Sequence, residues 1–188
     1  MKLHRFTTRE LTFLALMAAL TFVVNLVVSA GIIAATGVPA SSGLITGLTN
    51  GIFVTFVALT VRRYGALALF SFIYSVLALP TNMAGGPPGF VWKIPIMVIS
   101  ALIAEFILCS MHHRKLGFII AIPVYTVIDI GATVLAYWLL GLPELDALLN
   151  LVYLITVMFI VLGYVGMSIG FVLYNKMSKK RIIRQISA

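Results

Sequence analysis

Residues 11–61 read LTFLALMAALTFVVNLVVSAGIIAATGVPASSGLITGLTNGIFVTFVALTV and contain no charged side chain. Two further charge-free runs lie between Tyr64 and Trp92 and between Ala147 and Asn175. The hydrocarbon core of a bilayer is about 30 Å thick, so a helix needs roughly 20 apolar residues to cross it. The first run is therefore long enough for two transmembrane helices and a turn. Lipid offers backbone polar groups no partners, which makes helices the expected spanning structure.

The whole chain has the composition of a membrane protein. Of its 188 residues, 62% are apolar and only 10% are charged, whereas soluble domains are about 25% charged. We expect an all-α fold, an integral membrane bundle of six transmembrane helices that forms one domain over residues 1–188. The predicted spans are residues 10–33, 43–61, 64–82, 90–111, 117–140 and 148–175, separated by Gly/Pro-rich or basic turns.

The basic residues predict the orientation of this bundle. With six spans, twelve of the thirteen Lys and Arg residues fall on one face of the membrane and only Lys93 falls on the other. Cytoplasmic loops retain Lys and Arg, so we expect both termini in the cytoplasm and the protein in the cell membrane. The net charge of +8 is explained by these helix-flanking residues and by the tail of residues 176–184, which is expected to touch anionic lipid rather than nucleic acid.

Several kinds of chemistry have no sequence motif here. The chain has no Gly-x-x-x-x-Gly-Lys-Ser/Thr loop, no His-Glu-x-x-His helix and no Gly-x-Ser-x-Gly turn. Its single cysteine, Cys109, excludes an intrachain disulfide and a cysteine cluster for metal. We therefore expect no catalytic activity, no cofactor and no metal site in this chain.

An ionisable side chain within a membrane span is costly and is a candidate site by default. Asp129 lies near the middle of the fifth predicted span, and Tyr125, Thr133 and Tyr137 extend from it at four-residue spacing along one helix face. The stripe either lines a ligand pocket, in which Asp129 accepts a hydrogen bond or balances a cation, or is satisfied by neighbouring helices and holds the bundle together.

A second group of polar residues lies in the outer halves of the spans or at their outer ends. Trp92 and Lys93 stand at the outer end of the fourth span, where they either contact an anionic or carbonyl-bearing ligand or form an interfacial belt. Asn25, Asn50 and Asn82 are expected at a similar depth, either as ligand contacts or as hydrogen bonds between helices.

Two other features are expected to be structural. Glu105 lies toward the cytoplasmic end of its span and is expected to pair with Arg114 or Lys115 or to reach the interface. Glycines at close spacing on the second and sixth spans are expected to serve internal packing, because small residues let helix backbones approach closely. The glycines are Gly43, Gly47 and Gly51 on the second span and Gly163, Gly166 and Gly170 on the sixth.

The first span begins TRELTFLALMAAL at residue 8, with Ala15 and Ala19 in an Ala-x-x-x-Ala pattern, and residues 62–68 read RRYGALA. With these residues, its size and its six predicted spans, the chain resembles the substrate-binding S component of energy-coupling factor (ECF) vitamin transporters. The resemblance implies that Ala15 and Ala19 dock onto a transmembrane T subunit. It also implies two cytoplasmic ATPase subunits that energise uptake.

The same resemblance implies that the chain captures a vitamin or vitamin precursor at its outer side. The GGPPG loop at residues 85–89 is similar to that of S components for thiamine or its hydroxymethylpyrimidine precursor. A small intramembrane enzyme or assembly factor is the main alternative, and half of a dimeric secondary transporter is another. The capture subunit predicts an outward pocket lined by Asp129, Asn50 and Trp92 or Lys93. The enzyme or assembly factor predicts polar groups near Glu105 and the three histidines, His4, His112 and His113.

Overall fold

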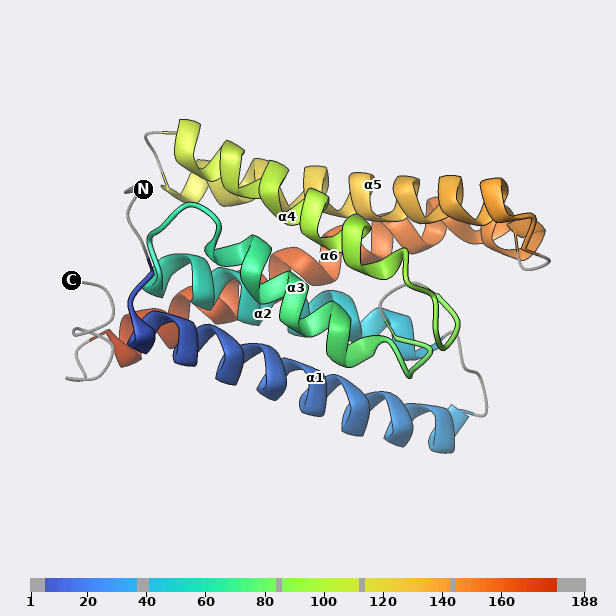
Figure 1. Ribbon diagram of the computed structural model, residues 1–188, viewed down its shortest axis with the longest axis horizontal. Helices are drawn as coiled ribbons and strands as arrows, with labels where there is room; N and C mark the ends of the chain where they lie inside the picture. The colour runs from blue at the N-terminus through green and yellow to red at the C-terminus, as the bar shows by residue number, and fades with distance from the viewer. Residues whose placement is uncertain (1–5, 37–40, 84–85, 112–113, 143–144, 179–188) are drawn as a thin grey trace.

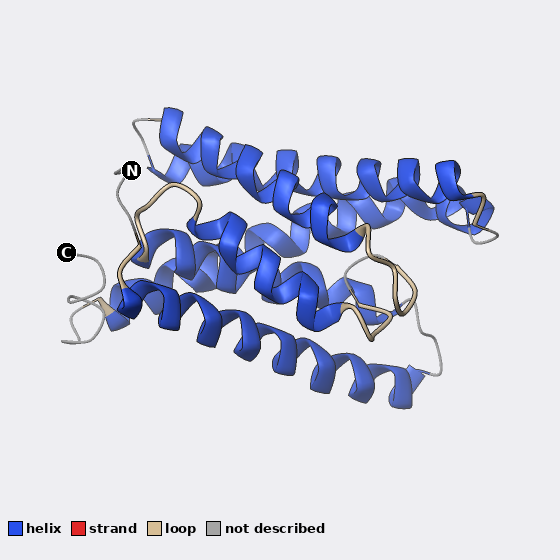
Figure 2. Cartoon of the chain, in the orientation of Figure 1, coloured by secondary structure: helices blue, strands red, loops and turns tan. Residues whose placement is uncertain are grey.

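The computed structural model describes residues 6–36, 41–83, 86–111, 114–142 and 145–178. Within these ranges the chain forms six α-helices and no strand, which confirms the predicted all-α class (Figures 1 and 2). The helices are α1 (Thr8–Thr36), α2 (Ser41–Thr60), α3 (Ala66–Ala78), α4 (Lys93–Ser110), α5 (Arg114–Leu140) and α6 (Leu145–Met177). Consecutive helices run in opposite directions along the bundle (Figure 1).

Four of the helices are long and apolar enough to cross a membrane. These stretches are Thr8–Gly31, Lys93–Ser110, Lys115–Leu140 and Leu149–Met177. The third predicted span, residues 64–82, is too long, because α3 has only 13 residues and a length of about 20 Å. Gly65 has a left-handed φ of 90°, which starts α3 there, and Pro80 has no N–H to continue it.

The six helices form a closed ring around the core. Going around the ring, the neighbours are α1, α2, α6, α5, α4 and α3, and α3 returns to α1. Side chains such as Leu14, Val57 and Phe70 are buried inside, whereas large apolar side chains such as Trp138 and Val172 are exposed on the outside. Helices that are apolar on all faces suit a bundle whose outer surface meets lipid.

The contact between α2 and α6 is the most extensive in the ring, and glycines make it possible. A Cβ atom on Gly51 would lie 2.6 Å from the carbonyl oxygen of Gly163, and one on Gly170 would lie 2.8 Å from that of Ile52. A Cβ atom on Gly166 would overlap the carbonyl oxygen of Leu48. The predicted packing role of these glycines is confirmed, and Gly43 lies outside the described side-chain positions.

Helix α3 is held at both ends by charged side chains of α4. Glu105 is 0% exposed and accepts hydrogen bonds from the backbone N–H groups of Gly65 at 2.8 Å and Leu67 at 2.7 Å. Lys93 is 1% exposed, and its Nζ donates to the carbonyl oxygen of Thr81 at 2.6 Å. A carboxylate at the amino end of a helix and an ammonium at its carboxyl end both complement the helix dipole. We call these two interactions the α3–α4 clamp.

The clamp corrects the expectation for Glu105. Glu105 neither pairs with Lys115 nor reaches the interface, because it is fully buried and both of its oxygens accept backbone N–H groups. The side chain of Arg114, the other expected partner, lies outside the described positions. The first N–H groups of any α-helix lack intrahelical acceptors. At the start of α3 these groups are buried away from water, so the carboxylate of α4 supplies the acceptors that they need.

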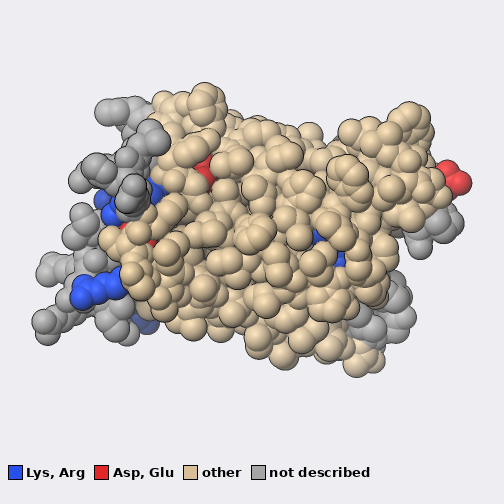
Figure 3. All heavy atoms as spheres, viewed as in Figure 1, with Lys and Arg blue, Asp and Glu red and all other residues tan. Residues whose placement is uncertain are grey.

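Basic side chains gather where α1 begins and α6 ends, which we call the basic end of the bundle (Figure 3). There Arg63 pairs with Glu10 at 2.5 Å, and Arg62 donates to the hydroxyl of Tyr174 at 2.7 Å. Glu10 also accepts the N–H of Thr7 at 2.7 Å, in a capping box that starts α1. These contacts hold the turn between α2 and α3 against the start of α1 and the end of α6.

Candidate functional site

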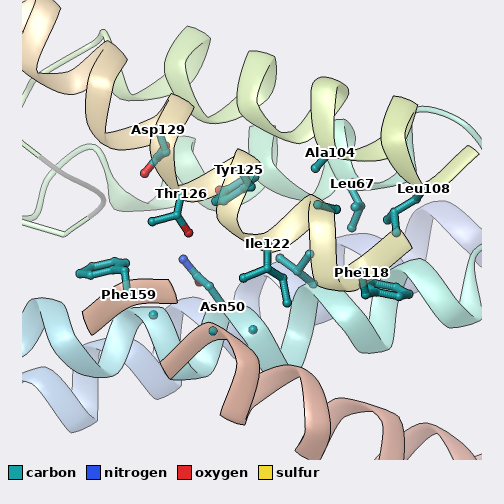
Figure 4. A pocket seen from close by; sticks show the side chains of 15 residues that line it. Asn50, Leu67, Ala104, Leu108, Phe118, Ile122, Tyr125, Thr126, Asp129 and Phe159 are labelled. Carbon is teal, nitrogen blue, oxygen red and sulfur yellow. The ribbon is translucent and has the colours of Figure 1, made fainter. Parts of the chain in front are cut away.

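A cavity of about 60 Å³ lies inside the ring, between α2, α3, α4, α5 and α6 (Figure 4). Helix α1 does not line it. The volume suits a few water-sized groups. Small-molecule pockets usually measure about 300 Å³ or more, so a solute of vitamin size requires side chains or helices around this cavity to move apart.

One end of the cavity is polar. Tyr125, Thr126 and Asp129 lie there on consecutive turns of α5, and Asn50 faces them from α2 (Figure 4). Residues three and four apart on a helix share a face, which explains why these three α5 side chains meet. Two facing helices therefore present a carboxylate, an amide and two hydroxyl groups to one small space.

Asp129 is the most unusual member of this group. Its Oδ1 atom is buried, and no described residue gives it a hydrogen bond. A buried polar atom without a partner costs about 1–3 kcal/mol, and a charged one costs more. In the part of the chain that the structure describes, no Lys, Arg or His lines the cavity. Within the described residues, Asp129 is therefore the side chain with the greatest unmet need for a donor or a cation.

The remaining wall of the cavity is apolar. It extends from Phe159 on α6 to Leu108 and Phe118, which lie within two turns of the basic ends of α4 and α5. Burying apolar surface is favourable in proportion to its area. The site thus combines a polar end near the middle of the bundle with an apolar wall toward its basic end.

The structure brings together three of the eight predicted binding residues, namely Asn50, Tyr125 and Asp129. Asn25 lies elsewhere in the interior, where it is 1% exposed. Its Nδ2 donates to the hydroxyl of Tyr74 at 2.8 Å, and its Oδ1 accepts from Thr49. These contacts join α1, α2 and α3, which is the interhelical role that the sequence left open for Asn25.

The structure does not bring Tyr137 and Asn82 to the cavity. Tyr137 lies eight residues beyond Asp129, about 12 Å along the helix, and packs against Phe90 with ring centres 5.5 Å apart. The polar stripe on α5 is therefore longer than the cavity. Asn82 is exposed in the turn after α3.

Trp92 and Lys93 also lie outside the cavity lining. Trp92 is 49% exposed at the start of α4, and the ammonium of Lys93 is occupied by carbonyl oxygens in the α3–α4 clamp. The expectation that one of them lines the pocket beside Asp129 and Asn50 is not met by this geometry. The reason is that Lys93 lies where α3 ends, so the carbonyl groups there are its nearest partners.

Sequence reasoning missed Thr126 and Phe159. Thr126 could have been found, because it is three residues before Asp129 and shares its helix face. Phe159 gave no such signal, since it is one of twelve phenylalanines in a strongly apolar chain. Among the described residues, no three His, Cys, Asp or Glu side chains gather in a group that could hold a metal ion.

The predicted docking residues lie on the outer helix α1. Ala15 is exposed and Ala19 is partly exposed, whereas their neighbour Ala18 is fully buried. Both are therefore available to a partner in the membrane. Their docking role stays a prediction.

A family described as hypothetical bacterial integral membrane proteins, Trep_Strep, matches residues 8–142. The chain belongs to the Trep_Strep family. This membership confirms the integral membrane class that the composition predicts. The range that matches Trep_Strep contains Asn50, Tyr125, Thr126 and Asp129, the whole polar end of the cavity. No curated protein and no solved structure matches this Trep_Strep chain.

Proposed function

We propose that this Trep_Strep protein is the solute-capture subunit of an ATP-driven importer of the ECF type. The observation that carries the proposal is the buried Oδ1 of Asp129, unpartnered within the described chain, at the polar end of the central cavity. A charged group at this depth is costly and is kept where it binds something. The proposed solute is a vitamin or vitamin precursor, and the thiamine or hydroxymethylpyrimidine type is the first to test.

In this proposal the chain crosses the cell membrane six times and keeps both termini in the cytoplasm. The alternating directions of the six helices and the gathering of Lys and Arg at one end support it (Figures 1 and 3). Helix α3 is short for a span, but it packs between α1 and α4. Irregular backbone at membrane depth is tolerated where protein covers it.

The energy for uptake would come from partner chains, namely a T subunit and two cytoplasmic ATPases. The sequence offers no phosphate-binding loop of its own. Ala15 and Ala19 on the outer face of α1 are small enough to let a partner helix approach closely. We therefore assign the T-subunit contact to this face of α1.

The alternative, an intramembrane enzyme or assembly factor, places the working polar groups near Glu105. Both oxygens of Glu105 accept backbone N–H groups, and the polar end of the cavity lies at the level of Asp129. This distribution differs from the one that the alternative predicts. The described cavity extends from the middle of the bundle toward its basic end, so the outward opening expected of a capture subunit is not seen in it. His4, His112 and His113, the other groups on which the alternative relies, lie outside the described residues.

Substitution of the small residues on α1 tests the division of labour. Ala15→Trp or Ala19→Trp should abolish uptake in cells, because a bulky side chain keeps the T-subunit helix away. Solute binding by the purified chain should be unchanged. Leu20→Trp is the matched control, since Leu20 is 43% exposed on the same helix and is neither three nor four residues from Ala15 or Ala19. Loss of binding as well as uptake would contradict the docking role.

Native mass spectrometry of the purified complex tests the proposal as a whole. We expect a co-purified small molecule on this chain, together with a T subunit and two ATPase subunits. Recovery of the chain with a different enzyme complex and without these partners would contradict the proposed function.

A further inference from the structure

The charges around the cavity restrict what can bind there. Among the described residues that line the cavity, Asp129 is the only carboxylic acid and none is basic. Two basic residues outside the lining have other partners, because Lys93 contacts Thr81 and Arg62 contacts Tyr174. The Oδ1 atom of Asp129 is buried without a hydrogen bond from any described residue, and such a charged oxygen is disfavoured. A bound solute removes this penalty if it brings a cation or a hydrogen-bond donor to Asp129.

The groups around Asp129 fit an organic ammonium. The aromatic rings of Tyr125 and Phe159 stand beside the polar end of the cavity, and the faces of such rings attract cations (Figure 4). Asn50 adds an amide that can accept a second N–H. Beyond these groups the wall is apolar, which suits the carbon skeleton of a solute.

The same lining is poorly suited to other ions. Hard inorganic cations such as Ca²⁺ need about six or more oxygen ligands, but only four side chains of the described lining carry polar atoms. A carboxylate or phosphate would meet the charge of Asp129 with no basic residue in the lining to offset it. The cavity therefore disfavours anionic solutes by charge and bare metal ions by ligand number.

We infer that the solute is a small organic molecule with a positively charged nitrogen, fixed or protonated, and no anionic group, and that Asp129 is its counter-charge. This inference rests on the proposed capture function, whose solute class it narrows. It excludes solutes that carry a carboxylate or a phosphate. It also makes Asp129 the residue that selects by charge, while Asn50, Tyr125 and Phe159 shape the site around it.

Three probes of similar length but different charge test this inference. Propylammonium, 1-propanol and propionate are small enough for the cavity, and their dissociation constants can be taken from ligand-induced thermal stabilisation of the full chain in nanodiscs. The wild-type protein should bind propylammonium about tenfold or more tightly than 1-propanol, because hydrogen bonds to a charged group are the stronger ones. Propionate should bind most weakly.

Two substitutions make the test specific to the cavity. Asp129→Asn should bring the affinities for propylammonium and 1-propanol within about threefold of each other, since it removes the charge and keeps the shape. Asp146→Asn is the matched control, because Asp146 is an exposed acid at the start of α6. It should retain the preference for the amine. An unliganded melting temperature close to wild type shows that each variant is folded.

Three results would overturn the inference. They are binding of propionate as tight as that of propylammonium, a tenfold amine preference that survives in Asp129→Asn, and displacement of propylammonium by an equal concentration of KCl. The last result would assign the site to an inorganic cation. None of them depends on partner chains. Uptake of an anionic vitamin by the intact transporter would uphold the capture function and refute the charge assignment. Amine binding by a chain that has no T or ATPase partners would uphold the charge assignment and refute the capture function.

Discussion

The α3–α4 clamp and the central cavity each contain a buried acid, and the two acids have opposite surroundings. Glu105 in the clamp has both carboxylate oxygens bonded to backbone N–H groups. Asp129 in the cavity keeps one buried oxygen without a hydrogen bond from any described residue. Burial of a charge therefore does not distinguish a structural residue from a binding residue. In the proposed function, the two acids are distinguished by the number of hydrogen-bond partners that the protein supplies.

The clamp also shows why α4 carries two charged residues inside the bundle. Lys93 and Glu105 are twelve residues apart on α4, a separation of about 18 Å, which matches the length of the 13-residue α3 beside it. One antiparallel helix can therefore satisfy both ends of the other. The cavity has no such match between opposite groups, which leaves Asp129 available for a ligand.

The largest predicted effect is at Glu105. Glu105→Ala should lower the free energy of unfolding by about 3–5 kcal/mol, because it leaves two buried N–H groups without acceptors and opens a void. Glu105→Gln should lower it less, since one amide oxygen can still accept. SDS-induced unfolding in mixed micelles measures both. If Glu105→Ala lowered the free energy of unfolding by less than about 1 kcal/mol, the structural role that separates Glu105 from Asp129 would be contradicted.

The next effect concerns the glycine contact that forms one wall of the cavity. Gly166→Ala should cost about 1–3 kcal/mol of unfolding free energy, because the new Cβ overlaps the carbonyl oxygen of Leu48. Gly131→Ala is the matched control on α5, where nothing lies within 4 Å of the added Cβ. It should stabilise the helix by about 0.5–1 kcal/mol. Equal effects of the two substitutions would contradict close α2–α6 packing.

A smaller effect is expected at the other end of the clamp. Lys93→Met keeps the length of the side chain but removes the donor to Thr81 and Ala78, so it should cost about 1–2 kcal/mol. Solute affinity should not change, because Lys93 does not line the cavity. Binding measured beside unfolding separates the two roles. A marked loss of solute affinity with little loss of stability would show that Lys93 acts in solute binding.

The helices and the glycine contacts could be predicted from the sequence because they depend on local patterns. Charge-free runs and glycines at four-residue spacing point to apolar helices and close packing without knowledge of neighbours. The length of α3 was overestimated because the apolar pattern continues past its end. Residues 79–82 lie outside α3, which ends at Ala78, and Pro80 marks this boundary in the sequence although the apolar pattern does not.

The candidate site was predicted only in part, and several errors have the same reason. Asp129 and Tyr125 share one helix face, so their meeting follows from spacing. The positions of Lys93 and Glu105 depend on which helix packs beside α4, and periodicity within α4 cannot give that neighbour. Asn25 is a similar case, since its bonds to Tyr74 and Thr49 come from two other helices.

The stability of Asp129→Asn without ligand tests the central claim most directly. If Asp129 serves binding, Asp129→Asn removes the cost of burying a charge that has no partner. The free energy of unfolding should then stay equal to wild type or rise by up to about 1 kcal/mol. The SDS-unfolding assay used for Glu105→Ala provides the comparison. A loss of about 2 kcal/mol or more would show that Asp129 holds the bundle together as Glu105 does, and would contradict its role as a binding residue.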